Sequence, residues 1–365
     1  MTKKLGNKSS PVVAIIGSRG IPNAYGGFES FLEAFCSSKQ CKDSVVRVIV
    51  YGEQPSNKVG NIEAVRLGVL KSQRPNWYYV KSTLKAIRRA DIVMSCGVGI
   101  SPVAVLVKLA GARLVVHPDG VEWNRSKWTR LQRVLIRLMY YPALVFADHI
   151  ILDSRSLAAA FPRWCARKST YIAYPAPPIV PMRQVDNAEC KDYALVIARL
   201  EPENNIEMII TGFLKSTHDH EMPLFIVGAV NTTHYRARLA KYASARIIFL
   251  GSIFDKDRLA NLRDGARIYF HGHSVGGTNP SLLEILVSHA RKISCHDNVY
   301  NREVALDNAV YFSESGDIKS IIYDSLGESE KMVNDTIAIR HRRMLSDARY
   351  NAPDVFNAYL SLLLS

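Results

Sequence analysis

Short runs of β-branched and other apolar residues recur along the first half of the chain, and each is followed by a longer segment with a helical period. Runs of this length bounded by polar or glycine-rich stretches are typical of buried parallel strands. The predicted strands are 12–17, 45–51, 91–95, 112–117 and 149–153. The helical segments between them are 28–38, 79–90, 101–110 and 126–141. This alternation predicts a doubly wound α/β sheet.

A stretch with four prolines at 173–186 has neither a strand period nor a helical period, which predicts a linker. After it the alternation of strands and helices restarts. The second set of predicted strands is 194–198, 224–228, 246–251, 267–272, 292–296 and 309–312. A helical pattern at 329–347 and an apolar helical segment at 355–364 end the chain.

We therefore expect an α/β protein with two Rossmann-like, doubly wound domains that face a cleft. The predicted domains are residues 1–178 and 179–350, and residues 351–365 form a helix expected to pack back on the first domain. In open α/β sheets ligands bind beyond the carboxyl ends of the strands, so the loops at those ends should carry the chemistry.

The formal net charge of +14 is unevenly distributed. Residues 1–185 carry 27 lysines and arginines against 10 acidic residues, whereas residues 186–365 carry 20 against 23. An anionic partner of the first half is expected: a nucleic acid, an anionic membrane surface or a phosphorylated substrate.

Six scattered cysteines with no C-x-x-C pair argue against a zinc site or a disulfide framework and favour reduced thiols in the cytosol. The best candidate for a membrane span, 101–116, is broken by Lys108 and Arg113. The first ten residues read as a short leader and not as a signal peptide. These features predict a cytoplasmic protein.

The loop "GSRGIPNAYGGFES" at 17–30 holds four glycines, and Gly26 and Gly27 stand just before a predicted helix, whose first N–H groups attract anions. It lacks the Walker A pattern. We interpret it as a ligand loop, because an ordinary strand-to-helix turn is shorter.

The loop "HPDGVEWNRSKW" at 117–128 offers acids, bases and hydroxyl-binding groups in His117, Asp119 and Glu122. The indole of Trp123 has a flat face suited to a sugar ring. The alternative is a helix cap, with Trp123 as a hydrophobic anchor for the following helix.

That following helix has a basic amphipathic pattern at 125–141. Its cations are Arg125, Lys127, Arg130, Arg133 and Arg137. Its apolar residues with a helical period are Leu131, Val134, Leu135 and Leu138. The pattern predicts either a helix that lies on an anionic membrane or a solvated basic face above a buried apolar stripe.

The strongest motif is "HGHSVGGTNPSLLEI" at 271–285. Asn279 is a good N-cap and Pro280 suits the first helical position. Because Gly276 and Gly277 precede them, the first N–H groups of this helix are expected to be open to a ligand, and they suit a diphosphate.

Two further residues complete this candidate site. Glu284 lies one turn inside the helix, within reach of the hydroxyls of a ribose or deoxyribose. Arg199 follows a predicted strand, and arginine makes forked hydrogen bonds to phosphate, although it could instead pair with Glu201 or Glu203. The "DKD" at 255–257 reads as a helix N-cap and not as a metal site.

Together these motifs resemble the retaining glycosyltransferases of the GT-B fold in the large family 4, and within it the branch that includes bacterial L-rhamnosyltransferases of surface-polysaccharide assembly. The matching stretches run in order from residue 15 to residue 304. They are "IIGSRGIPNAYGGFESF", "DGVEWNRSKW", "ARLEPENNIEMII", "HGHSVGGTNPSLLE" and "HDNVYNREV".

The resemblance implies that the second domain binds a nucleoside-diphosphate sugar, with dTDP-L-rhamnose as the expected donor. It implies that the first domain binds a polyprenyl-diphosphate-linked or other saccharide. No metal or other cofactor is expected, because arginine and helix N-termini neutralise the leaving diphosphate. The enzyme would lie peripherally at the inner face of the cell membrane, bind its anionic surface, and bind no nucleic acid.

The motifs and the resemblance together give the candidate site. The expected catalytic residues are Asp119, Arg199 and Glu284. The expected donor-binding residues are Gly26, Gly27, Arg199, Asn204, Gly276, Gly277, Thr278, Asn279, Ser281 and Glu284. The residues expected near the acceptor or the transferred sugar are His117, Glu122, Trp123 and His273.

Two positions depart from the broad family. It pairs two glutamates eight positions apart, but Gly276 stands where the first would be. It also has a lysine five residues after its arginine, where this chain has Asn204. The departures affect contacts to the diphosphate and to the transferred sugar.

Two other functions are compatible with parts of the sequence. A nucleotide-sugar epimerase or hydrolase of the GT-B type would need no lipid acceptor, which the basic first half argues against. A nucleic-acid-binding protein would explain the net charge, but no binding motif or aromatic-basic surface is present.

Overall fold

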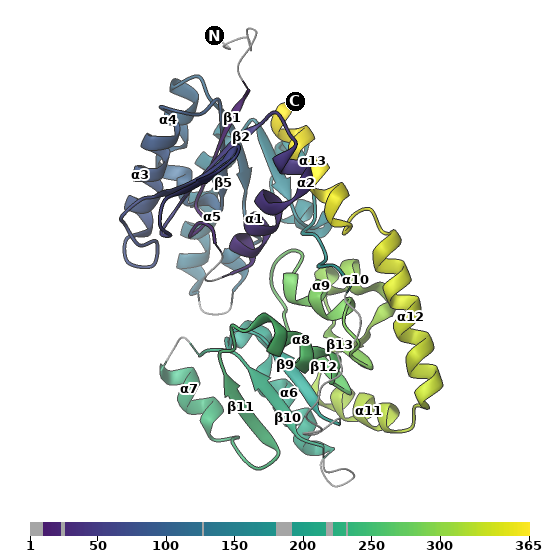
Figure 1. Ribbon diagram of the computed structural model, residues 1–365. Coiled ribbons are helices and arrows are strands. Elements are labelled where there is room, and N and C mark those ends of the chain that lie inside the picture. Colours follow the sequence, from purple (N-terminus) through teal and green to yellow (C-terminus); the bar gives the residue numbers. More distant parts are fainter. Residues whose placement is uncertain (1–9, 23–25, 126–127, 180–191, 217–221, 231–232) are drawn as a thin grey trace. The chain divides into compact units, whose positions relative to one another are not determined.

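The computed structural model of the chain describes residues 10–22, 26–125, 128–179, 192–216, 222–230 and 233–365. It divides into two compact units, each built on its own sheet (Figure 1). The first unit is formed by residues 1–124, 128–175 and 352–365, and the second by residues 125–127 and 176–351.

The first unit has an eight-stranded sheet in the order β3-β4-β2-β1-β5-β6-β7-β8. Neighbouring strands are parallel, except that β3 is antiparallel to β4. The central strands are buried along almost their whole length, as expected when helices cover both faces of a parallel sheet. The strands are β1 (Val12–Ile16), β2 (Arg47–Gly52), β3 (Asn57–Val59), β4 (Ile62–Arg66), β5 (Ile92–Cys96), β6 (Arg113–His117), β7 (His149–Leu152) and β8 (Ser169–Tyr171).

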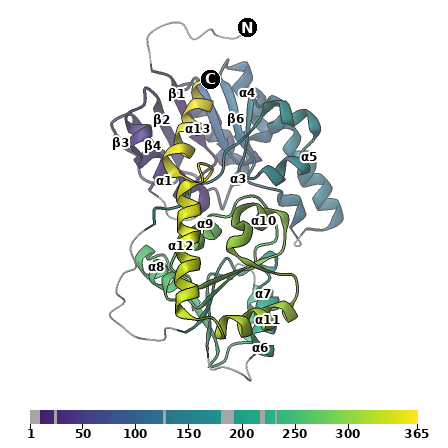
Figure 2. The same cartoon turned by 90° about the vertical axis from the view of Figure 1, so that its right-hand side faces the viewer.

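The helices of the first unit include the last helix of the chain. The α-helices are α1 (Gly27–Ser37), α2 (Lys39–Lys42), α3 (Pro75–Ala86), α4 (Ala104–Leu109), α5 (Arg130–Phe146) and α13 (Ala352–Leu364). The 3-10 helices are η1 (Val98–Val103), η2 (Glu122–Asn124), η3 (Arg155–Ala160) and η4 (Arg163–Lys168). Helix α13 lies beside α1 (Figure 2). Aromatic rings join the two helices: the centroids of Phe31 and Tyr359 lie 4.6 Å apart, and those of Phe35 and Phe356 lie 5.8 Å apart.

The second unit has a six-stranded parallel sheet in the order β11-β10-β9-β12-β13-β14. Its strands are β9 (Ala194–Ile197), β10 (Leu224–Val227), β11 (Ile247–Gly251), β12 (Ile268–His271), β13 (Lys292–His296) and β14 (Val310–Phe312). Its helices are η5 (Pro202–Asn204), α6 (Ile206–Lys215), α7 (Thr233–Ala240), α8 (Lys256–Asp264), α9 (Pro280–Leu286), α10 (Val299–Ala305), η7 (Leu306–Asn308), α11 (Ser315–Leu326) and α12 (Glu330–Ser346). The predicted α/β class with two doubly wound sheets is confirmed.

Each sheet has one place where the strand order reverses. In the first sheet β1 lies between β2 and β5, and in the second β9 lies between β10 and β12. Where the strand order reverses, the loops after the two adjacent strands run to opposite faces of the sheet. Ligands bind in the crevice between these loops. The loops after β1 and β5, and those after β9 and β12, are therefore the candidate ligand loops.

Helix α5 differs from its prediction. It was expected over 126–141, but it begins at Arg130 and continues through Pro142 to Phe146. A capping box of Thr129 and Gln132 sets its start. Pro142 has no N–H to donate, and the next N–H, that of Ala143, donates to Oγ of Ser101, 3.2 Å away.

A buried arginine anchors α9. The side chain of Arg340, on α12, is 1% exposed and donates to the carbonyl oxygens of Leu286, Ser288 and Ala290 at 2.7–3.0 Å. Burial lowers the pKa of Arg340 to about 10, which leaves it charged at neutral pH. It therefore caps the carboxyl end of α9, where a cation is favourable.

We predict that Arg340→Met lowers the free energy of unfolding by about 3 kcal/mol, because three buried carbonyl groups lose their donor at about 1 kcal/mol each. Urea denaturation followed by circular dichroism measures the change. The control is Arg342→Met, an exposed position on the same helix. Equal stability of the two variants would contradict the capping role.

Candidate functional site

The loops after β9 and β12 touch each other at the point of strand reversal. A Cβ on Gly272 would collide with the carbonyl oxygen of Asn204. The amide of Asn205 donates to the carbonyl of Gly272 (2.8 Å), and both the N–H and the hydroxyl of Ser274 donate to the carbonyl of Glu203 (3.0 and 2.8 Å). The two loops thus form one rigid platform at the carboxyl edge of the second sheet.

Arg199 and the start of α9 lie on this edge, at the ends of adjacent strands. The predicted cap is confirmed: Oδ1 of Asn279 accepts from the N–H of Ser281 (2.9 Å), and Pro280 occupies the first helical turn. The side chain of Arg199 is half exposed and its closest carboxylate, Glu201, is 4.0 Å away. The guanidinium is therefore available to a ligand, since an ion pair at that distance is weak.

The loop before α9 leaves space at Gly276, where, within the described part of the chain, a Cβ would approach only Nε2 of His273. The φ of Gly276 is +118°, which strongly favours glycine. Gly277 follows it, and Thr278 is buried. The loop thus presents mainly backbone to the solvent.

Glu284 has a partner that sequence reasoning missed. One of its carboxylate oxygens is bound by the guanidinium of Arg263, on α8, whose side chain is 11% exposed against 36% for Glu284. No short sequence pattern links residues 263 and 284, so only the fold reveals the pair. The pairing fixes the direction of the carboxylate and leaves its other oxygen for a ligand.

Asn204 and His273 are joined at the centre of the platform. Nδ1 of His273 lies 2.9 Å from Oδ1 of Asn204, and the Asn204 amide nitrogen donates to the carbonyl of Arg199 (2.6 Å). The carbonyl of His273 accepts from the side-chain amides of Asn298 (3.0 Å) and Asn301 (2.9 Å). Three asparagines therefore hold this one histidine.

In the first unit, the loop after β1 has a comparable arrangement. A Cβ on Gly17 would collide with the carbonyl of Cys96 at the end of β5, and the N–H of Arg19 donates to Glu29 (2.6 Å). Gly26 is the N-cap of α1 and Gly27 its first residue, as predicted. The intervening residues 23–25 lie outside the described part of the chain.

His117, at the end of β6, is buried between aromatic rings. Phe28 contacts it edge-on at 4.8 Å and Tyr174 lies at 5.6 Å. Neither ring nitrogen has a hydrogen-bond partner among the described residues. Burial lowers the pKa of His117 to about 3, so it is neutral at physiological pH.

The rest of the loop after β6 divides between exposed and packed groups. Asp119 is exposed and has a φ of 61°, an uncommon conformation for a residue other than glycine. Glu122 accepts from the indole N–H of Trp128 (3.3 Å).

The prediction that Trp123 offers a flat face to a sugar is wrong. Its indole is 8% exposed, packs edge-on against Tyr140 at 4.7 Å, and is covered by the guanidinium of Arg137 at 5.8 Å. It anchors α5, which was the alternative interpretation.

Helix α5 exposes its apolar stripe. The side chains of Leu131, Val134, Leu135 and Leu138 are 52–70% exposed, whereas Tyr140, Ala143 and Leu144 on the other side are buried. The interpretation of a basic face above a buried apolar stripe is therefore wrong. Arg130, Arg133 and Arg137 are exposed on α5.

One of the predicted membrane-facing cations, Arg125, does not belong to this exposed face. Arg125 precedes α5 and groups with the second unit, where its guanidinium lies 3.6 Å from Glu201 and 3.3 Å from Glu203. Its side chain is only 18% exposed, so the prediction is wrong for Arg125. Lys127 lies outside the described residues.

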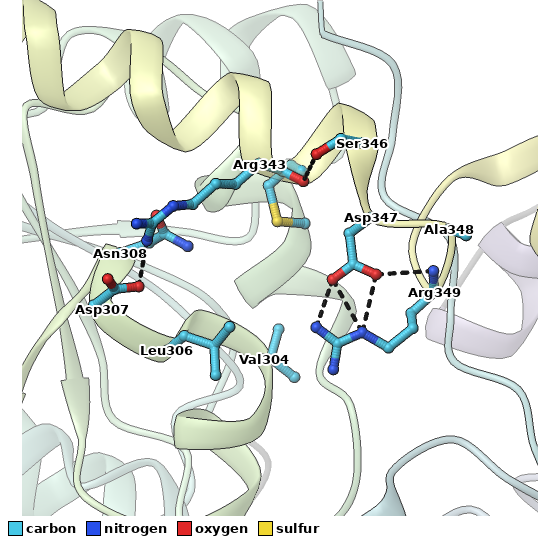
Figure 3. A pocket seen from close by; sticks show the side chains of 10 residues that line it. Val304, Leu306, Asp307, Asn308, Arg343, Ser346, Asp347, Ala348 and Arg349 are labelled. Atoms are coloured by element: carbon cyan, nitrogen blue, oxygen red, sulfur yellow. Dashed lines mark hydrogen bonds and ion pairs between the residues drawn. The ribbon is translucent and has the colours of Figure 1, made fainter.

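A pocket of about 480 Å³ occurs elsewhere in the second unit, between the η7 region and the end of α12 (Figure 3). Its two arginines are engaged: Arg343 pairs with Asp307, and Nε of Arg349 lies 2.9 and 3.0 Å from the two carboxylate oxygens of Asp347. Because both cations already have carboxylates, this pocket offers little to a phosphate.

The described residues contain no cluster of three or more His, Cys, Asp or Glu that could hold a metal ion. The carboxylate of Asp255 caps α8 by accepting from the N–H of Arg258 (2.7 Å), as predicted for the "DKD" segment. Within the same residues, no helix combines the length and apolar character needed to cross a bilayer.

A comparison with known protein families finds a match in the N-terminal half of the chain. Residues 11–177 match a family model described as a domain of unknown function, DUF1972. No curated protein matches the sequence significantly.

The whole chain is similar in structure to solved proteins of low identity. Anabaena Alr3699/HepE in complex with UDP is 14% identical, with a TM-score of 0.73, over 97% of this chain and 99% of that one. The α,α-trehalose-phosphate synthase (UDP-forming) from Burkholderia xenovorans, in complex with glucose-6-phosphate, is 10% identical, with a TM-score of 0.75, over 97% and 100%. The two sheets and their connections are thus those of a GT-B fold.

The buried histidines make stability depend on pH. Burial lowers the pKa of His271 to about 3, as for His117, whereas an unfolded histidine titrates near 6.5. Below pH 6.5 the unfolded chain binds protons that the folded chain cannot bind until about pH 3. The free energy of unfolding therefore decreases as the pH is lowered from 6.5 towards 3. Each histidine costs roughly 2 kcal/mol at pH 5.

We therefore predict that His271→Phe loses less stability than the wild type between pH 7 and pH 5. Urea midpoints at both pH values measure the difference. His234→Gln, at an exposed position, should follow the wild type. Parallel pH dependence of all three proteins would contradict the burial of a neutral His271.

Proposed function

We propose that the protein is a retaining, metal-independent glycosyltransferase that uses a nucleoside-diphosphate sugar. The observation that carries the proposal is the convergence of Arg199 and the capped start of α9 where the second sheet reverses its strand order. A guanidinium beside the positive end of a helix suits a diphosphate. Glu284, which pairs with Arg263, would accept hydrogen bonds from the hydroxyls of the nucleoside sugar.

The fold supports this class of substrate. Structures of Anabaena Alr3699/HepE were solved with UDP and with UDP-glucose, and an E. coli trehalose-6-phosphate protein was solved with UDP-2-fluoro glucose. For this chain we propose dTDP-L-rhamnose as the donor and a polyprenyl-diphosphate-linked saccharide of bacterial surface-polysaccharide synthesis as the acceptor. The resemblance of its motifs to family 4 rhamnosyltransferases supports this choice.

In the proposed reaction the bond between the anomeric carbon and the diphosphate breaks, and the acceptor oxygen bonds to the same face of the sugar. The leaving phosphate takes the proton of the acceptor hydroxyl. Arg199 and the positive end of α9 would stabilise the charge that develops on the leaving diphosphate. The first unit would bind the acceptor, with the exposed Asp119 and the glycine loop at the start of α1 as candidate contacts; the expected role of His117 does not fit its burial.

We predict that dTDP, UDP or GDP binds the wild-type protein and that Arg199→Ala weakens binding by roughly 10- to 100-fold, the loss expected for a charge-assisted pair. Isothermal titration calorimetry measures both values. Arg258→Ala removes an exposed arginine on α8 and should bind like the wild type. No binding of any of the three nucleotides to the wild type would rule the proposed function out.

We further propose that α5 holds the enzyme on an anionic membrane surface. Its inner side is packed into the unit, so the exposed apolar stripe belongs to a well-anchored helix. Leu109 at the end of the contacting helix α4 is 79% exposed as well. Apolar side chains flanked by Arg130, Arg133 and Arg137 suit insertion between acidic headgroups.

We predict that changing Arg130, Arg133 and Arg137 together to glutamine weakens binding to phosphatidylglycerol-containing vesicles by roughly 100-fold, at about 1 kcal/mol per arginine. Vesicle flotation measures binding. The matched control changes Arg47, Arg74 and Arg88, three exposed arginines of the same unit, to glutamine.

Two outcomes separate the explanations. A loss confined to the α5 variant supports docking through this helix, and an equal loss in both variants shows only a general effect of net charge. A second variant, Leu131→Gln with Leu135→Gln, should also lose binding if the apolar stripe inserts.

A further inference from the structure

Two stretches of the sequence converge on one residue, His273. Asn204 of "EPENN" contacts its ring, and Asn298 and Asn301 of "HDNVYN" bind its backbone carbonyl. Asn301 is 2% exposed, and Asn298 also caps α10 with its side-chain oxygen. Such a set of buried amides holds a loop in one position, which is what a group that must meet a ligand at a fixed distance requires.

The orientation of the Asn204 amide follows from its surroundings. The carbonyl oxygen of Arg199 can only accept, so the atom that lies 2.6 Å from it must be the amide nitrogen of Asn204. The other end of the amide is then an oxygen, which can only accept. It faces Nδ1 of His273 at 2.9 Å.

This orientation determines the tautomer of His273. Nδ1 must carry the proton, because it faces an acceptor. In a neutral imidazole Nε2 then has a free lone pair and accepts hydrogen bonds. Burial, reinforced by repulsion from Arg199 and Arg125, lowers the pKa of His273 to about 4, so the ring is neutral at physiological pH.

Nε2 faces the loop before α9. It lies 3.6 Å from the position that a Cβ on Gly276 would occupy, and among the described residues no other non-neighbouring heavy atom lies within 4 Å of that position. The space beside Nε2 is thus left open by a glycine whose φ of +118° strongly disfavours a side chain.

We propose that Nε2 of His273 accepts a hydrogen bond from a hydroxyl group of the transferred sugar, and that Asn204 is the positioning residue that fixes the tautomer. The inference rests on the proposed function, since it takes the diphosphate to lie at the start of α9. If the diphosphate binds at the start of α9 and the nucleoside at Glu284, the transferred sugar at the other end of the diphosphate would lie beside residues 273–277. The site then selects sugars that carry a hydroxyl donor at that position.

The experiment compares nucleotide sugars with the matching nucleotides. Dissociation constants of dTDP, dTDP-L-rhamnose, UDP and UDP-glucose are measured by calorimetry for the wild type and for His273→Phe. We expect His273→Phe to bind the nucleotide sugar of the preferred pair about tenfold more weakly, because a buried hydroxyl loses its acceptor. Binding of the diphosphate alone should stay within about twofold.

His273→Gln should recover part of the loss, because its amide oxygen reaches the position of Nε2. His234→Gln, on the exposed side of α7, is the histidine control. If the wild type binds neither diphosphates nor nucleotide sugars, the proposed function is wrong and this inference with it. The other outcome is that the wild type binds both kinds of ligand. If His273→Phe then shows the same difference in affinity between nucleotide sugar and nucleotide as the wild type, only this inference is wrong.

The tautomer is tested separately, in the folded wild-type protein. Two-bond ¹H–¹⁵N correlation of the histidine rings should show Nδ1 of His273 protonated and Nε2 bare. A proton on Nε2 would overturn the proposal even if His273→Phe failed to fold. In Asn204→Leu the ring should become a mixture of tautomers, and the affinity for the nucleotide sugar should fall more than the affinity for the matching diphosphate.

Discussion

The contact between the loops after β9 and β12 is the constraint on which the candidate site depends. Gly272 lies so close to the carbonyl of Asn204 that a larger residue would force the loops apart. If they separated, the Asn204 amide could not bridge the carbonyl of Arg199 and the ring of His273. The position of Arg199 and the tautomer of His273 therefore follow from one missing side chain.

The same logic extends to the opposite end of α9. A helix of seven residues has little stability of its own, so the proposed site needs both ends of α9 held in place. Arg340 holds its carboxyl end and Asn279 caps its start. Because both ends are fixed before any ligand binds, the site loses little binding energy to reorganisation.

Local patterns in the sequence predicted what depends on neighbours in the chain. The buried strands and the Asn279–Pro280 helix start were of this kind, and the structure has them. Periodicity alone did not show which side of α5 faces the core, because that side is chosen by the surface beneath it. The pairs Arg263–Glu284 and Asn204–His273 join residues 21 and 69 positions apart, so no local pattern reveals them.

In the proposed site, the two departures from the pattern of the family that the motifs resemble offset each other in charge. Asn204 replaces a lysine that would add a positive charge beside the diphosphate, and Gly276 replaces a glutamate that would add a negative one. Losing only the lysine would weaken the hold on the diphosphate, and losing only the glutamate would leave the sugar without an acceptor. In the proposed site a neutral histidine would supply an acceptor with no negative charge to compete for Arg199, so one arginine and the positive end of α9 would suffice for the diphosphate.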